Sequence, residues 1–313
     1  MSIPVNIDNF VEAENSRMFR DLQAQAGGVN TFSHNRVPSP IDNQFVVRLN
    51  RDTLYSFATV DLRGGLKLTL PDAGDRYLSA MFVDQTHHIS VVLHEPGVYE
   101  VTEEAVGSRW AAVAIRILVD AESEQDLAEV ARLQDGLHIE ASSAEPFVMA
   151  DFDVASLDAT RELLLRLGDG LVGMDHLFGT VEETTETRHL IGTAAGWGGL
   201  PTKEAVYVSV LPPGEGRFEL EMAEVPVDGF WSISVYNAQG YFVPNDRDSY
   251  TINNITAAKN ANGSVTVRFG DFDDDVDNVI PTPAGWNFLV RLYQPKTQVL
   301  DGTWQVPSLV PVD

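Results

Sequence analysis

The chain has 313 residues and carries 46 acidic against 21 basic side chains, a formal net charge of −25. This negative charge argues against binding to nucleic acid or to an anionic membrane, because phosphate binding needs clustered lysines and arginines. The sequence contains no cysteine, which excludes disulfides, a thiolate nucleophile and a cysteine zinc site.

The N-terminal residues lack a basic segment followed by an apolar run, so no signal peptide is expected. No apolar run reaches the roughly 18 residues that suggest a membrane span. The sequence therefore predicts a cytoplasmic protein that does not enter a membrane.

The first 40 residues are expected to form a helix and an extended connector. Residues 8–26 place Phe10, Phe19 and Leu22 near one helix face, and Gly27 with Gly28 follows as a stop signal.

Residues 41–121 predict a β-sandwich of the immunoglobulin type. Leu66, Leu68 and Leu70 alternate with polar residues, as in a strand with one buried face. Regularly spaced turns separate further expected strands, over residues 54–62, 77–83, 89–93 and 111–119.

Residues 122–203 change to a helical period, and residues 204–313 return to strands. The expected helices follow residue 123 and cover residues 158–167, 174–178 and 187–191. The later strands are expected at residues 206–210, 218–222, 230–235, 264–269 and 288–293. Asn262 and Gly263 give a strong two-residue hairpin signal before the fourth of these.

Two groups of short motifs resemble a known pair of families. The first is NRDTLYS at residues 50–56 with LP at 70–71 and RY at 76–77; the second is FWSISVY at 230–236, RLY at 291–293 and DGTW at 301–304. They resemble the paired domain of unknown function families 1254 (N-terminal) and 1214 (C-terminal). The resemblance implies a mainly β protein, with an immunoglobulin-like sandwich, a central helical segment and a C-terminal jelly roll.

Asp84, His87, His88 and His94 form the best catalytic candidate. A carboxylate can orient an imidazole as a general base, or the two can bind a metal together. The alternative is a polar loop with surface histidines, because neighbouring side chains on extended chain point in opposite directions.

Asn50, Arg51 and Tyr55 are candidates for substrate contact. Arg51 could clamp a carboxylate with its planar guanidinium, or pair with a buried aspartate to hold the turn. Tyr55 could donate a hydrogen bond or lie in the core.

In the C-terminal domain, aromatic residues and one arginine are candidate ligand-binding groups. The aromatic set is Trp231, Tyr236, Tyr250, Trp286 and Tyr293. They could stack on sugar rings or fill the core. Arg291 interrupts an apolar strand, so it is expected either in solvent or buried with a carboxylate partner such as Asp246 or Asp248.

Residues 271–277 are rich in aspartate. Asp271, Asp273, Asp275 and Asp277 could supply oxygen ligands to calcium, although the spacing differs from an EF-hand. A solvated acidic loop is the alternative.

No Gly-x-Ser-x-Gly elbow, Walker loop or His-Glu-x-x-His motif occurs. The first functional hypothesis is therefore a hydrolase or lyase that acts on a small polar molecule, in a cleft between the two β-domains. Asp84, His87 and Arg51 would be catalytic. Two alternatives remain: a non-catalytic carbohydrate- or ligand-binding protein, and a structural or homo-oligomeric protein with a calcium-stabilised loop.

Overall fold

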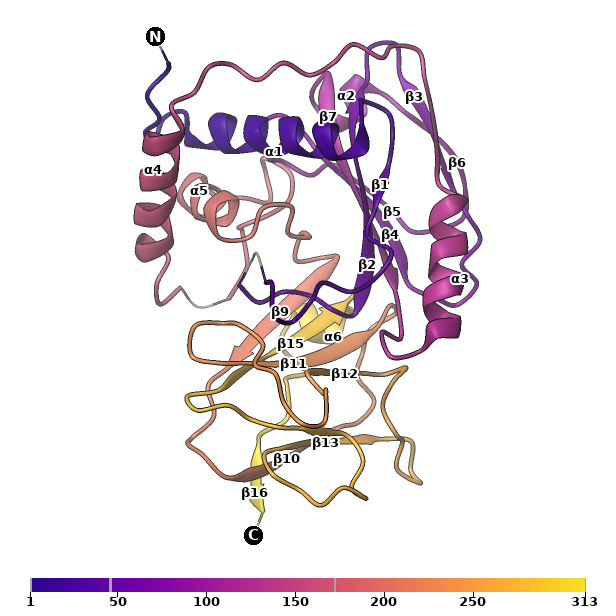
Figure 1. Ribbon diagram of the computed structural model, residues 1–313, viewed down its shortest axis with the longest axis vertical. Coiled ribbons are helices and arrows are strands. Elements are labelled where there is room, and N and C mark those ends of the chain that lie inside the picture. Colours follow the sequence, from indigo (N-terminus) through magenta and orange to yellow (C-terminus); the bar gives the residue numbers. More distant parts are fainter. Residues whose placement is uncertain (1, 45–46, 172, 313) are drawn as a thin grey trace. The chain divides into compact units, whose positions relative to one another are not determined.

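The computed structural model describes residues 2–44, 47–171 and 173–312 (Figure 1). Contacts divide the chain into two compact units. The first comprises Met1–Arg36, Leu54–Leu118 and Glu124–Thr202, and the second comprises Val37–Thr53, Val119–Ser123 and Lys203–Asp313. The predicted mainly β character is confirmed. In the described part of the chain, no helix is long and apolar enough to cross a membrane.

The helices of the first unit are α1 (Phe10–Ala26), α2 (Glu103–Val106), α3 (Glu124–Asp135), α4 (Val154–Leu167) and α5 (Glu186–Ala195). Its strands are β1 (Ser33–His34), β2 (Thr53–Asp61), β3 (Leu66–Leu70), β4 (Leu78–Val83), β5 (Val91–Leu93), β6 (Gly97–Val101), β7 (Trp110–Leu118) and β8 (His138–Ala141). Five strands form one sheet in the order β1-β2-β7-β4-β5, and three form another in the order β6-β3-β8.

Strand β3 has one buried face, as the alternation of its leucines predicted. Leu66, Leu68 and Leu70 are buried, whereas Lys67 between them is exposed. Strand β4 is buried along its whole length, so both of its faces are covered by other parts of the protein. The turn that follows β4 therefore starts from a fixed position.

Helix α1 forms and ends as expected. Gly27 has a φ of 77°, in the left-handed region that glycine adopts without steric cost, and its N–H bonds back to the last helical turn. Phe10 and Ala13 pack against Leu157 and Leu164 of α4. Helices α1, α4 and α5 thus form one group (Figure 1).

The second unit contains α6 (Thr297–Leu300) and strands β9 (Ala205–Val210), β10 (Arg217–Met222), β11 (Trp231–Tyr236), β12 (Thr251–Asn253), β13 (Val265–Phe269), β14 (Val279–Ile280), β15 (Asn287–Tyr293) and β16 (Val310–Val312). They form two four-stranded sheets, β14-β13-β10-β16 and β12-β11-β15-β9. One apolar core, which includes Ile233, Val267 and Phe288, joins residues of both sheets.

Some of the expected local elements differ from the structure. Residues 174–178 form turns and bends rather than a helix, and His176 within them has a φ of 63°, outside the helical region. Asn262 and Gly263 do form a tight turn, but not a hairpin, since β13 pairs with β10 and β14. The short strands β6 and β8 were not expected, because runs of five and four residues give too short a pattern to stand out in the sequence.

Candidate functional site

The turn after β4 is organised by Asp84. Its Oδ1 accepts hydrogen bonds from the backbone N–H groups of Thr86 and His88, at 2.7 and 2.8 Å. It also accepts one from the Thr86 hydroxyl at 2.9 Å. Asn15 of α1 donates its side-chain amide to the Asp84 carbonyl, which ties the turn to the helix. Asp84 therefore contacts backbone and hydroxyl groups rather than an imidazole.

His87 is fully buried, and both of its ring nitrogens are occupied. The Gly198 N–H donates to Nε2 at 3.0 Å, so the proton must be on Nδ1. Nδ1 then donates to the Thr193 hydroxyl at 2.8 Å, and that hydroxyl donates to the His189 carbonyl. This network fixes one neutral tautomer.

Aromatic rings enclose His87. Trp197 stacks on it with 5.9 Å between ring centroids, and Phe178 meets it edge-on at 6.1 Å. Burial lowers the pKa of His87 far below 6.5, and the neighbouring His189 and His88 lower it further. Since no ring nitrogen is available to a substrate, the geometry argues against the catalytic role expected for His87.

His88 has the free nitrogen that His87 lacks. The Thr86 hydroxyl donates to Asp84, so it must accept from Nδ1–H of His88, 2.9 Å away. Nε2 of His88 is then unprotonated in the neutral ring, and no group in the described residues hydrogen-bonds to it. The side chain is half-buried. Asp84, Thr86 and His88 thus form a chain that orients one imidazole with a basic nitrogen free to react.

His189 of α5 completes the cluster. Its Nε2 donates to the Thr86 carbonyl at 2.9 Å, and its ring lies parallel to that of His88 with 4.2 Å between centroids. Its Nδ1 is buried, and no polar partner for it occurs in the described parts of the chain. Burial and His189 together lower the pKa of His88, against the opposing charges of Asp84 and Glu182. His88 is therefore neutral, and able to accept a proton, at pH 7.

The other candidates of the N-terminal half lie in separate surroundings. Arg51, in the second unit, donates to the Ser39 carbonyl and lies over the Tyr250 ring, 5.7 Å from its centroid. Asn50 donates to Thr53 and to the Tyr293 hydroxyl. Tyr55, in the first unit, stacks on Phe57.

His94 bonds through Nδ1 to the carbonyl of Leu78. It shares no described contact with Asp84, His87 or His88. The expected four-residue cluster is thus reduced to three by the structure.

The C-terminal aromatic residues cannot form a sugar-binding platform. All five are buried: Trp231, Tyr236, Tyr250, Trp286 and Tyr293. Trp231 and Trp286 belong to the core between the two sheets, and Tyr293 stacks on Phe230. The interpretation of these side chains as a surface for stacking on sugars is therefore wrong.

The aspartate-rich loop does not gather its carboxylates. Asp271, Asp273, Asp275 and Asp277 are exposed, and neighbouring Asp274 lies 3.6 Å from Arg247. Among the described residues, no three His, Asp or Glu side chains are arranged to hold a metal ion. The geometry favours a solvated acidic loop.

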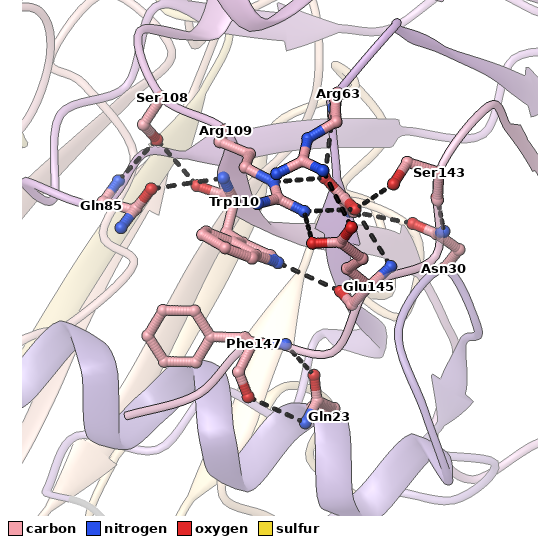
Figure 2. Close-up of polar contacts among 11 residues, drawn as sticks. Gln23, Asn30, Arg63, Gln85, Ser108, Arg109, Trp110, Ser143, Glu145 and Phe147 are labelled. Carbon is pink, nitrogen blue, oxygen red and sulfur yellow. Dashed lines mark hydrogen bonds and ion pairs between the residues drawn. The ribbon is translucent and has the colours of Figure 1, made fainter. Parts of the chain in front are cut away.

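A second polar cluster of the first unit is structural. The Asp61 carboxylate, which is fully buried, pairs with Arg109 at 3.0 Å and accepts further bonds from the Ser143 hydroxyl and the Glu145 N–H. Figure 2 shows Arg109 also reaching Glu145, beside the Trp110 ring. Both Asp61 oxygens are satisfied, so this network holds the segment around residue 145 in place.

Burial alone would raise the pKa of Asp61. The bonds from Arg109, Ser143 and two backbone N–H groups outweigh burial and hold the pKa well below its ordinary range. The carboxylate is therefore ionised except in strong acid, and it has no free oxygen with which to act on a substrate.

Sequence reasoning missed Thr86, His189, Thr193 and Gly198. His189 and Thr193 are four residues apart on α5 and so share one face, but the helix predicted from the sequence ended at residue 191, and nothing in the sequence links that face to residue 87. The contact between Thr193 and His87 joins residues 106 positions apart. Only the tertiary structure shows it.

Comparisons with known proteins agree with the predicted resemblance. Residues 29–141 match the family model described as "Protein of unknown function (DUF1254)", and residues 212–297 match "Protein of unknown function (DUF1214)". No curated protein matches the chain.

Two solved structures share the fold. The VPA0106 protein from Vibrio parahaemolyticus gives a TM-score of 0.71 at 16% identity, over 98% of each chain. An uncharacterized protein from Burkholderia cenocepacia gives 0.54 at 15% identity, over 97% of this chain and 88% of that one. Identities this low establish similarity of fold alone.

Proposed function

Since this chain belongs to the paired DUF1254 and DUF1214 families, whose descriptions state no activity, we propose a function from its own side chains: an enzyme that acts on a small polar molecule, with His88 as general base. The observation that carries the proposal is the chain from Asp84 through Thr86 to His88, which leaves Nε2 unprotonated. A base is most effective when its pKa is near or below the working pH, so that it is neutral before reaction.

The reaction class follows from what accompanies this base. The chain has no cysteine, and its sequence has no nucleophile motif of the common hydrolase types. A lone base serves best by activating water, as in a hydrolase, or by removing a proton from carbon, as in a lyase.

Turnover of a panel of small esters, amides and hydroxy acids tests the proposal. We expect His88→Gln to lower kcat by about 10²- to 10⁴-fold at pH 7. Thr86→Val, which keeps the shape of the side chain but removes the acceptor of Nδ1–H, should also lower kcat. His138→Asn is the matched control, because His138 is exposed. Unchanged turnover in His88→Gln would remove His88 from the mechanism, and no turnover of any compound would count against an enzyme.

A second candidate function, binding of an apolar ligand without catalysis, is supported by a pocket in the second unit. The pocket has a volume of about 590 Å³, in the range of small-molecule sites. Its lining is mainly aliphatic and includes Val206, Val208, Val210, Leu292, Val299, Trp304, Val306 and Leu309. Decanol should then change the fluorescence of Trp304, and Val208→Asp should abolish the change whereas Val98→Asp, at an exposed position, should not.

We also propose a specific fold type for each of the two units. The second unit has eight strands in two four-stranded sheets, the strand count of a jelly roll. The two sheets of the first unit support an immunoglobulin-like sandwich, but their strands lie within residues 33–141 rather than 41–121, and residues 41–53 and 119–121 group with the second unit. A cytoplasmic location and a homo-oligomeric state are also proposed, to be checked by cell fractionation and by light scattering.

A further inference from the structure

Arg291 of the second unit is a buried cation held by neutral groups. Its side chain donates to the Ser234 hydroxyl at 2.7 Å, the Tyr236 hydroxyl at 2.7 Å and the Arg48 carbonyl at 2.9 Å. The residue is only 2% exposed. In the described residues, no carboxylate hydrogen-bonds to it. A buried guanidinium without a bonded anion is unfavourable by several kcal/mol in general, so this arrangement requires an explanation.

A second guanidinium lies beside the same tyrosine. The Cζ atoms of Arg48 and Arg291 lie 5.9 and 6.0 Å from the centroid of the Tyr236 ring. Nη1 of Arg48 is buried, and the described chain supplies no hydrogen-bond partner for it. Burial lowers the pKa of Arg48, and the charge of Arg291 adds to the effect. Two guanidinium groups thus lie near the same tyrosine ring, and Nη1 of Arg48 is a hydrogen-bond donor without an acceptor in the described chain.

One nearby carboxylate does not balance these charges. Asp52 acts on Arg291 electrostatically; its Oδ1 accepts bonds from Thr251 and Asn253, and its buried Oδ2 has no hydrogen-bond partner among the described residues. One aspartate against two arginines leaves an excess positive charge, in a protein whose net charge is −25. Arg48 also has a φ of 53°, a left-handed conformation that is unfavourable for a non-glycine residue and that occurs often at ligand clamps.

We infer that the guanidinium groups of Arg48 and Arg291, which flank the Tyr236 ring, form a binding site for a small oxyanion, a carboxylate or phosphate group. The Tyr236 hydroxyl orients Arg291 but does not bind the anion, because it donates its proton to the Leu49 carbonyl. A guanidinium presents planar pairs of donors that match the two oxygens of such groups. The free Nη1 of Arg48 supplies a donor that the protein leaves unused. This site lies wholly in the second unit and does not depend on the proposed role of His88.

Thermal unfolding of the full chain with added anions tests the inference. Sodium acetate, succinate and phosphate are compared with sodium chloride at equal ionic strength, so that general screening cancels. A bound anion stabilises the folded state by mass action, so at least one of the three should raise Tm by a few degrees in a saturable manner. Acetate and succinate against phosphate separate a carboxylate site from a phosphate site. If none raises Tm above the chloride reference, the inference is overturned.

Variants assign the effect to the site. Arg48→Met should weaken the anion response at least tenfold, and Arg48→Lys, which keeps the charge but not the planar donors, should weaken it less. Arg217→Met is the matched control, because Arg217 is an exposed arginine of the same unit that also lies over an aromatic ring, that of Phe272. A wild-type response in both Arg48 variants, or an equal loss in the control, would overturn the assignment.

Discussion

The rings of His88 and His189 lie parallel, 4.2 Å apart between centroids, although the two residues come from a turn and a helix a hundred residues apart. His189 this close to His88 disfavours a positive charge on the His88 ring. His189 in addition bonds to the Thr86 carbonyl, so it fixes the backbone that carries the acceptor of His88. The stack therefore affects both the basicity and the orientation of the proposed base.

The titration of His88 should report this stack directly. Burial and His189 lower its pKa, so we expect an NMR titration midpoint below 6.5. His189→Phe keeps a flat ring against His88 without a charge, and should move the midpoint upward. Glu182→Gln removes an opposing charge and should move it downward. A wild-type midpoint at or above 6.5 would contradict the account.

His87 should make the protein sensitive to mild acid. Its pKa is far below 6.5 in the folded state but near 6.5 in the unfolded chain, so below about pH 6.5 the unfolded state binds more protons. Stability should then fall as the pH drops, by up to about 1.4 kcal/mol per pH unit from this group. Denaturant unfolding of the wild type and of His87→Asn at several pH values measures the difference.

In the His87→Asn variant, this part of the pH dependence should disappear. Asparagine tolerates the left-handed backbone at this position, where φ is 64°, and its amide can replace Nδ1–H toward Thr193. Nothing replaces Nε2, so the Gly198 N–H loses its acceptor, at a cost of about 1–3 kcal/mol at neutral pH. An unchanged slope below pH 6.5 would show that other groups cause the acid sensitivity.

The parts of the fold that were predictable are those set by local pattern. The end of α1 at Gly27 depends only on neighbouring residues, so the sequence predicts it. The alternation of leucines in β3 likewise indicates that one face of that strand is buried. The predicted hairpin at Asn262 did not form, because strand pairing is not set by local pattern. The turn itself is local, but β13 pairs with β10, which lies more than forty residues earlier.

The candidate site was predictable only in part. The sequence indicated Asp84 and the adjacent histidines, because a carboxylate and imidazoles in one turn suggest a base. It could not show which histidine is enclosed, since that depends on Trp197, Phe178 and Thr193 from distant segments. Arg291 was expected either in solvent or buried with a carboxylate; it is buried and bonds to hydroxyl and carbonyl groups, which no pattern in β15 reveals.

The ion pair between the buried Asp61 and the partly exposed Arg109 should contribute to stability. Asp61→Asn keeps the shape but removes the charge that holds Arg109, Ser143 and the Glu145 N–H, while Arg109 keeps Glu145, so it should cost about 1–3 kcal/mol. Asp158→Asn, which alters an exposed pair with Arg161, should cost less than about 1 kcal/mol. Chemical denaturation measures both. Equal losses of unfolding free energy in the two variants would mean that the network around Asp61 stabilises the protein no more than an exposed ion pair does.

The same carboxylate predicts a loss of stability in strong acid. The folded pKa of Asp61 lies below that of the unfolded chain, about 3.8, so its contribution is complete above that pH and is lost as the pH falls below it. Asp61→Asn should therefore unfold with a weaker pH dependence below pH 4 than the wild type. This window is distinct from that of His87, so the two effects can be separated in one series.

Calcium should not stabilise the acidic loop. Because Asp271, Asp273, Asp275 and Asp277 are exposed and do not converge, we expect the same Tm with millimolar calcium and with EDTA. Asp273→Asn should behave like the wild type in both conditions. A calcium-dependent rise in Tm that this variant loses would restore the calcium hypothesis.

Gly199 should be intolerant of any side chain, because the ring that covers His87 occupies the space. A Cβ at Gly199 would lie 2.7 Å from Cδ2 of Phe178, well inside van der Waals contact. Gly199→Ala must therefore displace Phe178, which meets the His87 ring edge-on, and should cost about 1–3 kcal/mol. Gly214→Ala is the control, with open space around its Cβ and an expected change within about 0.5 kcal/mol. Adding Phe178→Leu should recover part of the loss, because the smaller side chain makes room for the methyl group. If the double variant is no more stable than Gly199→Ala, the clash with Phe178 is not the cause.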